Sequence, residues 1–326
     1  MSVLGNSFIL VTGGTGSFGK AFIRHVLDHL DPRRIAVLSR DELKQSEMRK
    51  DFPDDRLRWF IGDIRDRERL TRAFHGVDYV VHAAALKQVD TAEYNPYEYV
   101  KTNIIGSQNV IEAALDTGVR KVVALSTDKA SSPINLYGAT KLTADKLFVG
   151  ANNYSDAQGA DFAVVRYGNV MGSRGSVIPL FRRLLAEGKP LPVTDARMTR
   201  FWITLPQAVD FVVDSFDRMT GGELFVPRIP SMRVTDLIEV LAPGTPTFEI
   251  GIRPGEKLHE EMISADDSYR TVRQADRYVV KPTVQEWWFT QPPGDPVEPG
   301  FSYRSDTNDL WLAPEELRAL LADGRA

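Results

Sequence analysis

FILVTGGTGSFG, residues 8–19, is the stretch that decides the fold. Its apolar start, Phe8–Val11, predicts a short buried strand, and the residues from Lys20 to about His29 predict a helix. The glycines between them follow the spacing G-x-x-G-x-x-G. Glycines permit a tight turn and close approach of the backbone to a pyrophosphate, and the start of the helix offers free N–H groups to the anion. The stretch therefore predicts a dinucleotide-binding unit. Contacts to the dinucleotide are expected from Gly13, Thr15, Gly16, Ser17, Phe18 and Gly19.

The same alternation of strand and helix continues along the chain. Further strands are predicted at Arg34–Ser39, Arg58–Arg65, Asp78–His82, Lys121–Ser126 and Phe162–Tyr167. This rhythm predicts an α/β fold, a Rossmann-like doubly wound parallel sheet with right-handed crossovers. After residue 168 the rhythm gives way to glycine-rich loops with polar side chains, as in a substrate-binding lobe. We expect residues 1–168 to form the dinucleotide-binding domain. Residues 169–326 are expected to form mainly a smaller substrate-binding lobe, with room for segments that return to the first domain.

The end of the second strand bears on the choice of dinucleotide. An NAD enzyme usually offers a carboxylate there to the ribose 2′-hydroxyl. Here Ser39 and Arg40 come first, and a hydroxyl and a guanidinium suit a 2′-phosphate. NADP is therefore favoured, and Lys44 is expected to be a further contact to it. NAD stays an alternative, because the carboxylate of Asp41 follows one residue later. Arg40 as a solvated surface arginine is the alternative interpretation.

The fourth strand runs into Ala83, Ala84 and Ala85, and small residues at such a strand end let a flat cofactor lie against the backbone. Lys87 follows them and is expected near the pyrophosphate or the substrate, with an ordinary loop lysine as the alternative. A long helix is predicted from Pro96 to Thr117, and Thr102 on this helix is expected to lie near the cofactor site at the end of the fourth strand.

Composition narrows the class of protein. The chain has 326 residues, 43% of them hydrophobic, and a net charge of −4, so it can bury a large core and no nucleic acid or anionic membrane is implied as a partner. It has no cysteine, which excludes thiol catalysis and thiolate metal sites, and no metal ligand set is proposed. Neither a secretory signal nor a membrane span is indicated, so a cytoplasmic protein is expected.

The stretch Ser126–Lys141, STDKASSPINLYGATK, carries the catalytic pattern. Tyr137 and Lys141 are four residues apart, on one face of the predicted helix. A free phenol has a pKa of about 10, so it can act as a base near neutrality only beside a fixed cation, which Lys141 is placed to be. Thr127, at the strand end, can hydrogen-bond the same oxygen. Tyr97 and Lys101 fit the same spacing but lack the preceding strand, and we interpret them as helix surface.

Thr127, Tyr137 and Lys141 resemble the Ser/Thr–Tyr–Lys triad of the short-chain dehydrogenase/reductases. Within the extended members that act on nucleotide sugars, the chain is similar to the inverting UDP-N-acetylglucosamine 4,6-dehydratases, which begin pseudaminic acid synthesis. The motifs that carry the resemblance are TGGTGSFG, LSRDELK, AALKQVDTAEYNP, STDKASSPINLYGATK, RYGNVMGSRGSVIP, MTRFW and RPGEKLHEEM. Asp128-Lys129 decides within the group, because simple 4-epimerases have no such acid/base pair. Membrane-anchored retaining relatives share Asp-Lys but usually carry Met where Tyr137 stands.

The resemblance implies a mechanism. Tyr137, as phenolate, takes the proton of the sugar 4-hydroxyl while hydride leaves C4 for the nicotinamide. Lys129 then removes the C5 proton, for which its pKa must be lowered by desolvation or a neighbouring cation such as Lys141. Asp128 must be protonated to give a proton to the departing 6-hydroxyl, and hydride returns to C6. Because neighbours on an extended segment point to opposite faces, the chain must bend after Thr127.

The resemblance also implies the remaining contacts. Asp63 and Ile64 would lie beside the adenine. The UDP and sugar would be held by Lys87, Asn169, Arg174, Val177, Arg200, Arg253 and Glu256. UDP-N-acetylglucosamine is the expected substrate and a homo-oligomer the expected assembly. Three alternatives stay open: a 4-epimerase, a dehydratase that retains the C5 configuration, and a non-catalytic NADP-binding interaction protein, against which the intact triad argues.

Overall fold

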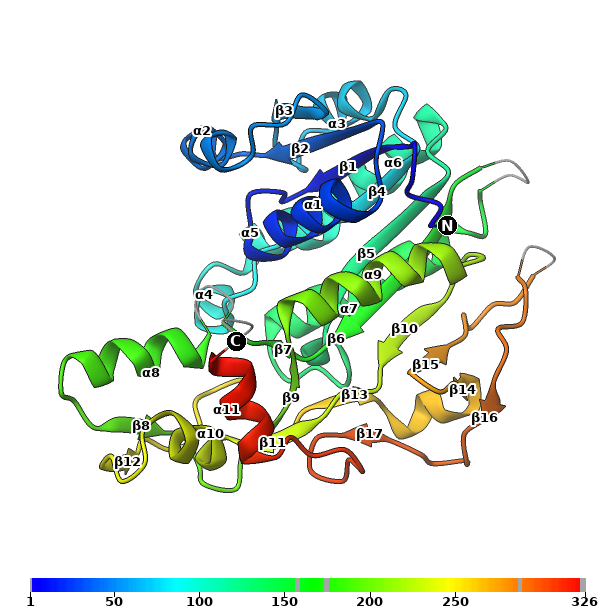
Figure 1. Cartoon of the computed structure of the whole chain (residues 1–326). Coiled ribbons are helices and arrows are strands. Elements are labelled where there is room, and N and C mark those ends of the chain that lie inside the picture. The colour runs from blue at the N-terminus through cyan, green and yellow to red at the C-terminus, as the bar shows by residue number, and fades with distance from the viewer. Residues whose placement is uncertain (1, 156–158, 173–175, 287–288, 323–326) are drawn as a thin grey trace.

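The computed structural model describes residues 2–155, 159–172, 176–286 and 289–322. Within these ranges a ten-stranded sheet forms the centre of the molecule, in the order β16-β14-β15-β10-β6-β5-β4-β1-β2-β3 (Figure 1). The strands from β3 to β10 are parallel. They are β1 (Phe8–Thr12), β2 (Arg34–Ser39), β3 (Leu57–Ile61), β4 (Tyr79–His82), β5 (Lys121–Thr127), β6 (Asp161–Tyr167) and β10 (Leu224–Pro227).

This order confirms the predicted Rossmann-like doubly wound sheet. The chain moves outward from β1 to β3 and then restarts at β4 on the other side of β1, so the strand order reverses between β1 and β4. Ligands of such sheets bind at this reversal, outside the carboxyl ends of the strands. Two predicted boundaries were wrong. The third strand ends at Ile61 and not at Arg65, because the chain turns at Asp63, whose carbonyl accepts from the Asp66 N–H at 3.0 Å. The helix predicted from Lys20 begins three residues earlier, at Ser17.

Helices cover both faces of the sheet. α1 packs against α9 on one face, and α3, α6 and α7 lie together on the other. Their bounds are α1 (Ser17–His29), α2 (Glu42–Asp51), α3 (Arg67–Phe74), α4 (Val89–Tyr94), α5 (Pro96–Tyr99), α6 (Gly106–Thr117), α7 (Leu136–Ala151) and α9 (Leu205–Arg218). The helix predicted from Pro96 to Thr117 is continuous, but Val100–Ile105 is wound as a π-helix. Such segments often mark functional places in helices.

The π-helical segment fixes the loop after β4. Asn103 accepts a hydrogen bond from the Leu86 N–H at 2.9 Å and donates one to the Leu86 carbonyl at 2.9 Å. Its Nδ2 also donates to Thr140 on α7 at 3.1 Å. One buried amide thus ties the helix, the loop and α7 together.

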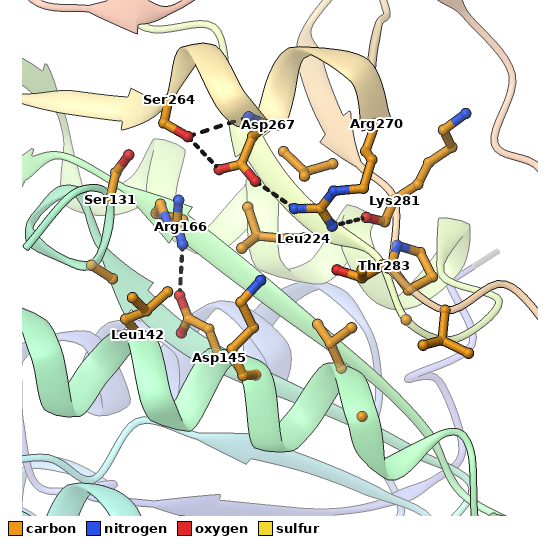
Figure 2. A pocket seen from close by; sticks show the side chains of 18 of the residues that line it. Ser131, Leu142, Asp145, Arg166, Leu224, Ser264, Asp267, Arg270, Lys281 and Thr283 are labelled. Atoms are coloured by element: carbon orange, nitrogen blue, oxygen red, sulfur yellow. Dashed lines mark hydrogen bonds and ion pairs between the residues drawn. The ribbon is translucent and has the colours of Figure 1, made fainter.

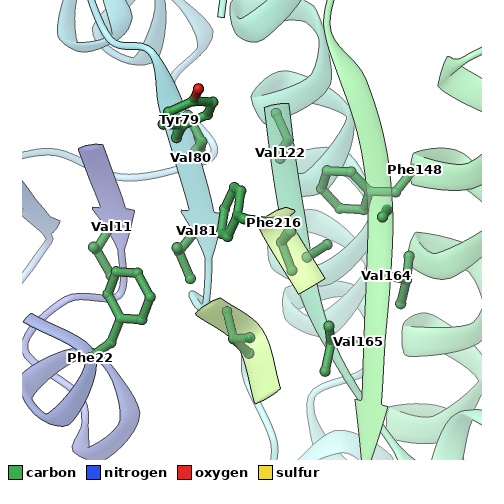
Figure 3. Close-up of a cluster of buried hydrophobic side chains, with 14 of the residues drawn as sticks. Val11, Phe22, Tyr79, Val80, Val81, Val122, Phe148, Val164, Val165 and Phe216 are labelled. Carbon is green, nitrogen blue, oxygen red and sulfur yellow. The ribbon is translucent and has the colours of Figure 1, made fainter. Parts of the chain in front are cut away.

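The core lies between the sheet and its two layers of helices. Alternate strand residues meet aromatic rings from the helices, such as Phe22 of α1, Phe148 of α7 and Phe216 of α9 (Figure 3). The parallel strands read as continuous apolar runs because both of their faces are covered. This rigid layer holds the carboxyl ends of the strands in place.

The last part of the chain contributes both to this sheet and to a separate lobe. β14 (Thr271–Arg273), β15 (Arg277–Val280) and β16 (Asp295–Pro296) extend the sheet beyond β10 as antiparallel strands. The lobe contains small sheets and three helices of the described chain, around a core that includes Trp202, Phe181 and Leu317. Its elements are β7 (Asn169–Val170), α8 (Val177–Ala186), β8 (Leu191–Val193), β9 (Thr199–Ile203), β11 (Ser231–Arg233), α10 (Val234–Leu241), β12 (Thr247–Glu249), β13 (Glu261–Ile263), β17 (Tyr303–Arg304) and α11 (Pro314–Ala322). None of the helices in the described ranges is long and apolar enough to span a bilayer.

Candidate active site

The glycine-rich turn after β1 forms a cradle against the end of β4. Gly13 has a φ of +67°, and a Cβ on it would lie 2.9 Å from the Cα of Ala84. A Cβ on Gly19 would lie 2.6 Å from the Cα of Gly14, so only glycine lets α1 pack this closely on the turn. Gly16 occupies the N-cap position of α1 and has no side chain to cap it, which leaves the first N–H groups of the helix for an anion. The residues present therefore fit a dinucleotide pyrophosphate.

Thr15, Ser17 and Phe18 lie in and directly after this turn. Thr15 is buried, Ser17 opens α1, and the ring of Phe18 stacks near Phe22 and Tyr167. Phe18 thus helps to anchor the start of α1 to the core.

The side chains after β2 are already engaged with one another. Asp41 caps α2 by accepting from the Lys44 N–H at 3.0 Å, and its other oxygen pairs with the Lys44 ammonium at 2.7 Å. Arg40 is half exposed and lies 3.6 Å from Asp63, which is also held by Arg65. Ser39 is buried, and its hydroxyl accepts from Gln45 at 3.2 Å. A guanidinium is thus the most open polar group at this strand end, while the nearby carboxylate is occupied.

The loop after β4 faces the same region. Ala83 and Ala84 are half-buried, and Ala85 and Lys87 are exposed. Ile64 is buried and touches the position that a Cβ on Gly106 would occupy. Thr102, within the π-helical segment, is buried, and its hydroxyl has no hydrogen-bond partner among the described residues. A buried hydroxyl without a partner among the described residues is a candidate contact for a ligand.

The catalytic stretch is a strand end, a tight turn and a helix start. Thr127 ends β5, and Asp128–Ala130 form a single 3₁₀ turn that provides the bend expected at this point. Asn135 then caps α7 by accepting from the Gly138 N–H at 2.7 Å. Tyr137 and Lys141 lie on the buried face of α7. The structure therefore brings Thr127, Asp128, Lys129, Tyr137 and Lys141 into one small region.

The ammonium of Lys129 sits between two carboxylates. Its Nζ lies 3.1 Å from Asp128 Oδ1 and 3.2 Å from Glu260 Oε1, and Thr127 donates to the same Asp128 oxygen at 2.8 Å. The expectation of a lowered pKa for Lys129 is wrong for this structure. Burial lowers the pKa, but the charges of Asp128 and Glu260 outweigh it and hold the pKa above its usual value.

The surroundings of Tyr137 favour the neutral phenol over the phenolate. Burial raises its pKa to about 12, against the charge of Lys129 and the hydrogen bond with Thr127, which both lower it. The cation expected in this role was Lys141. Its ammonium instead donates to the Leu125 carbonyl at 2.7 Å, and burial, opposed by the charge of Asp145, lowers its pKa. Lys129, and not Lys141, is the largest charge that lowers the pKa of Tyr137 here.

Sequence reasoning missed Glu260 and Asp145. Glu260 is 2% exposed and reaches Lys129 from the residue before β13. Asp145 pairs with Arg166 at 2.9 Å and accepts from Ser126 at 2.8 Å, so it holds β5, β6 and α7 together. The motif RPGEKLHEEM was noticed, but it contains three glutamates, and nothing local in the sequence distinguishes the one that reaches Lys129.

The residues expected to hold the substrate are spread over the lobe. Arg200 is 9% exposed, donates to the carbonyls of Thr199, Leu258 and Lys257, and lies 3.7 Å from Glu260. Arg253 pairs with Glu256, whose second carboxylate oxygen is buried without a partner in the described chain. Asn169 lies in β7, where it pairs with Trp202, and Val177 begins α8. Arg174 lies outside the described residues.

A cavity of about 360 Å³ lies behind the catalytic turn (Figure 2). Its lining includes Ser131 from the turn, Asp145 on α7, Arg166 on β6 and Arg270. Asp128, Lys129 and Tyr137 do not line it. The cavity is therefore distinct from the place where the acid and base groups meet.

The second tyrosine–lysine pair, Tyr97 and Lys101, is helix surface, as the sequence indicates. Tyr97 is 65% exposed, Lys101 lies 5.1 Å from its ring centroid, and the ammonium of Lys101 pairs with Glu98. Tyr97 is exposed and Lys101 half-buried, whereas Tyr137 and Lys141 are both buried.

Comparisons with known proteins agree with this geometry. A family model described as polysaccharide biosynthesis protein matches residues 9–282. A UDP-N-acetylglucosamine 4,6-dehydratase (inverting) of Campylobacter jejuni subsp. jejuni is 53% identical over 325 residues, covering 96% of each chain. A UDP-glucose 4-epimerase of Rickettsia canadensis is 40% identical over 277 residues, covering 83% of this chain and 81% of that protein. Among solved structures, Pen from Bacillus thuringiensis is 38% identical with a TM-score of 0.91, covering 98% of each chain.

Proposed function

The chain belongs to the polysaccharide biosynthesis protein family of extended short-chain dehydrogenase/reductases, and from this premise we propose that it is an inverting UDP-N-acetylglucosamine 4,6-dehydratase. The observation that carries the proposal is the near full-length similarity to the Campylobacter enzyme of that name. The cluster of Thr127, Asp128, Lys129 and Tyr137 supports it, because it holds an acid and two bases for the two halves of a dehydration. The reaction removes water and leaves no net oxidation.

A nicotinamide dinucleotide is the proposed cofactor. The turn at Gly13–Gly19 would hold its pyrophosphate, and Ala83–Ala85 its flat face. When bound, it supplies a carbon that accepts the C4 hydride and returns it at C6. We favour NADP because Asp41 is occupied by Lys44, whereas Arg40 and Ser39 can meet a 2′-phosphate.

Tyr137 and Thr127 serve the first half of the reaction. Tyr137 takes the proton of the 4-hydroxyl as hydride leaves C4. The Thr127 hydroxyl, which donates to Asp128 in this structure, would turn its proton to the phenolate. The raised pKa of the ligand-free phenol means that added positive charge must favour the phenolate, and Lys129 already acts in that direction.

Asp128 and Lys129 serve the second half. Their facing atoms are 3.1 Å apart, so transfer of one proton from the ammonium to the carboxylate gives a carboxylic acid and a free amine together. The amine of Lys129 then takes the C5 proton, and Asp128 gives its proton to the departing 6-hydroxyl. Asp128 Oδ2 is buried without a partner in the described chain, which leaves it free to meet that hydroxyl.

A 4-epimerase is the second candidate, since the Rickettsia relative carries that name. An epimerase returns hydride to C4 and needs neither an acid for the 6-hydroxyl nor a base for C5. The pair of a buried Asp128 and a half-buried Lys129 has no task in that reaction. A retaining dehydratase would use the same pair and differs only in the face at which C5 receives its proton.

One incubation separates these candidates. The protein is mixed with UDP-N-acetylglucosamine and no added oxidant, and the products are followed by mass spectrometry and NMR. The proposal requires loss of one water and a 4-keto-6-deoxy sugar with the L-configuration at C5. An unchanged mass with an inverted C4 would identify an epimerase, and a product that keeps the D-configuration would identify a retaining dehydratase.

The proposed product is UDP-2-acetamido-2,6-dideoxy-β-L-arabino-hexos-4-ulose, and its use in pseudaminic acid synthesis is part of the proposal. We also propose that residues 1–168 mainly hold the dinucleotide and that residues 169–326 mainly hold the UDP-sugar. The homo-oligomeric state and the cytoplasmic location stay predictions.

A further inference from the structure

Glu260 is a buried carboxylate beside the acid–base pair to which the mechanism above gives no task. Its Oε1 lies 3.2 Å from the ammonium of Lys129 and 3.7 Å from Arg200 Nε. Its Oε2 is buried and has no hydrogen-bond partner among the described residues. A carboxylate buried this fully is rare unless it is paired, so its place next to Lys129 calls for a function.

The backbone at Glu260 is held in place from two directions. Its N–H donates to the Ser305 hydroxyl at 2.9 Å, and its carbonyl accepts from the Ser305 N–H at 2.9 Å. The Ser305 hydroxyl also bonds Thr199 Oγ1 at 2.7 Å. The next residues form β13, which pairs with β17. Glu260 therefore presents its carboxylate from a fixed part of the lobe, while Lys129 comes from the turn after β5.

We propose that Glu260 is a positioning residue of the dehydration step: its carboxylate holds Lys129 beside Asp128 and stabilises the ammonium that forms when Lys129 takes the C5 proton. The proposal rests on the proposed function, since it assigns Lys129 as the base. The step is balanced within the site. The proton leaves C5 for the Lys129 amine, the C5–H electrons form the C5–C6 double bond, the C6–O bond breaks, and Asp128 gives its proton to the oxygen that leaves as water.

The charges around Lys129 show why a second carboxylate is needed. Asp128 must hold a proton at the moment of the reaction, and it then no longer attracts the ammonium. Arg200 disfavours an ammonium at Lys129, and Lys257 lies near enough that the two lysines affect each other. By this step Tyr137 has taken the proton of the 4-hydroxyl and carries no charge. Glu260 is thus the group that remains to stabilise Lys129 once Asp128 is neutral.

The test compares Glu260→Gln with Glu261→Gln as a matched control. Glutamine keeps the shape and the hydrogen-bonding capacity of Glu260 but not its charge. Glu261 is the next residue, and its carboxylate accepts from the hydroxyls of Ser131 and Ser132 rather than from Lys129. Glu260→Asp keeps the charge on a shorter side chain and serves as the conservative variant. Water loss and C4 oxidation are followed separately, over a range of pH.

Above the acid limb of the pH profile, kcat for water loss should fall by up to about 10-fold in Glu260→Gln, because a base whose pKa is about one unit lower is a weaker base. KM and C4 oxidation should change little. The acid limb of the pH profile should move to lower pH by about one unit, since an opposite charge within 4 Å raises a lysine pKa by about that much or more. Glu261→Gln should leave the limb in place, and Glu260→Asp should bring it back toward the wild-type position.

A second measurement does not depend on turnover. In ligand-free protein labelled with ¹³C at lysine Cε, the resonance lost in Lys129→Gln reports the titration of Lys129. It should titrate at lower pH in Glu260→Gln than in the wild type. An unmoved titration and an unmoved acid limb would overturn the inference, and so would an acid limb that disappears, because Glu260 itself would then be the titrating group. If the wild-type protein does not dehydrate the sugar, the proposed function is wrong. The NMR titration would still show whether Glu260 raises the pKa of Lys129.

Discussion

Gly138 lies so close to the catalytic turn that a Cβ on it would be 2.1 Å from the carbonyl oxygen of Lys129. The first turn of α7 therefore packs directly on the 3₁₀ turn that carries Asp128 and Lys129. The contact is between two backbones, so no movement of a side chain could relieve the clash that a larger residue would cause. The glycine of Tyr-Gly-Ala-Thr-Lys thus sets the distance between the tyrosine base and the acid–base pair.

We expect Gly138→Ala to push α7 away from this turn. Overpacking of this kind typically lowers the free energy of unfolding by about 1–3 kcal/mol. The misplaced catalytic groups should also lower kcat, even at temperatures where the variant is fully folded. Thermal unfolding and kcat measure the two effects. Gly150→Ala on the same helix is the control, since no described atom lies within 4 Å of the place that a Cβ on Gly150 would take, and it should unfold at the wild-type temperature or slightly above. Full activity in Gly138→Ala would show that the turn can move without loss.

Arg40 should determine the preference for NADP. Because Asp41 is occupied by Lys44, we expect Arg40→Ala to weaken NADP by about 1.5–3 kcal/mol, the scale of a charge-assisted hydrogen bond, and to leave NAD nearly unchanged. Calorimetric titration with each dinucleotide measures both affinities. Equal losses for the two cofactors would mean that Arg40 does not meet the 2′-phosphate.

Tyr137→Phe should abolish oxidation at C4 while the UDP-sugar still binds, because the phenolate of Tyr137 is the group that takes the 4-hydroxyl proton. Absorbance of the nicotinamide reports the oxidation, and calorimetry reports binding. Tyr97→Phe is the matched control, since Tyr97 is exposed and stands in the same spacing. Loss of oxidation in the control instead would show that the catalytic tyrosine was wrongly chosen.

His82 makes the stability of the folded protein depend on pH. It is buried between Thr12 and Ser107, and burial, helped by the charge of Lys141, lowers its pKa to about 3. The unfolded chain binds a proton near pH 6.5 that the folded protein does not, so stability present above that pH is lost as the pH falls toward 3. The slope from one such group is about 1.4 kcal/mol per pH unit. His82→Gln should remove this share of the slope, measured by urea unfolding between pH 7 and pH 4. Equal slopes in the two proteins would contradict a neutral buried His82.

The fold was predictable because its signals are local. The Gly13–Gly19 turn and the apolar runs each act within a few residues, and their rhythm alone predicts the parallel sheet. The sequence left room for segments that return to the first domain, but it did not predict the antiparallel strands β14, β15 and β16. Those strands are short and come from a segment without the alternating rhythm, so only their contacts with β10 identify them.

The candidate site was predictable only in part, and for a related reason. Asp128, Lys129 and Tyr137 lie within one short stretch, so the sequence shows that they meet. Their protonation states depend on partners from elsewhere in the chain. Glu260 reaches Lys129 from the lobe and, together with Asp128, raises the lysine pKa that was expected to be lowered. No residue near position 129 in the sequence indicates this contact. Long-range electrostatics of this kind follow from the tertiary fold.

Lys129→Ala should separate the two halves of the reaction. Hydride transfer from C4 depends on Tyr137, whose phenolate Lys129 helps to stabilise. C4 oxidation should therefore slow but continue, and a 4-keto sugar should accumulate before water loss. A positioned general base is typically worth a factor of about 10² to 10⁴, and water loss should fall by that much while C4 oxidation falls far less.

In the wild type run in deuterated water, inversion requires solvent deuterium at C5, on the face opposite to the one deprotonated, and a C6 hydrogen that came from C4. Mass spectrometry and NMR of the product locate both. Lys101→Ala is the control, because Lys101 pairs with Glu98 on the helix surface and should change neither half. If Lys129→Ala loses water at a near-normal rate, another group is the C5 base. If the wild-type product keeps the D-configuration, the enzyme is a retaining dehydratase, because the pair at Asp128 and Lys129 is compatible with either face and only the delivery of the C5 proton distinguishes them.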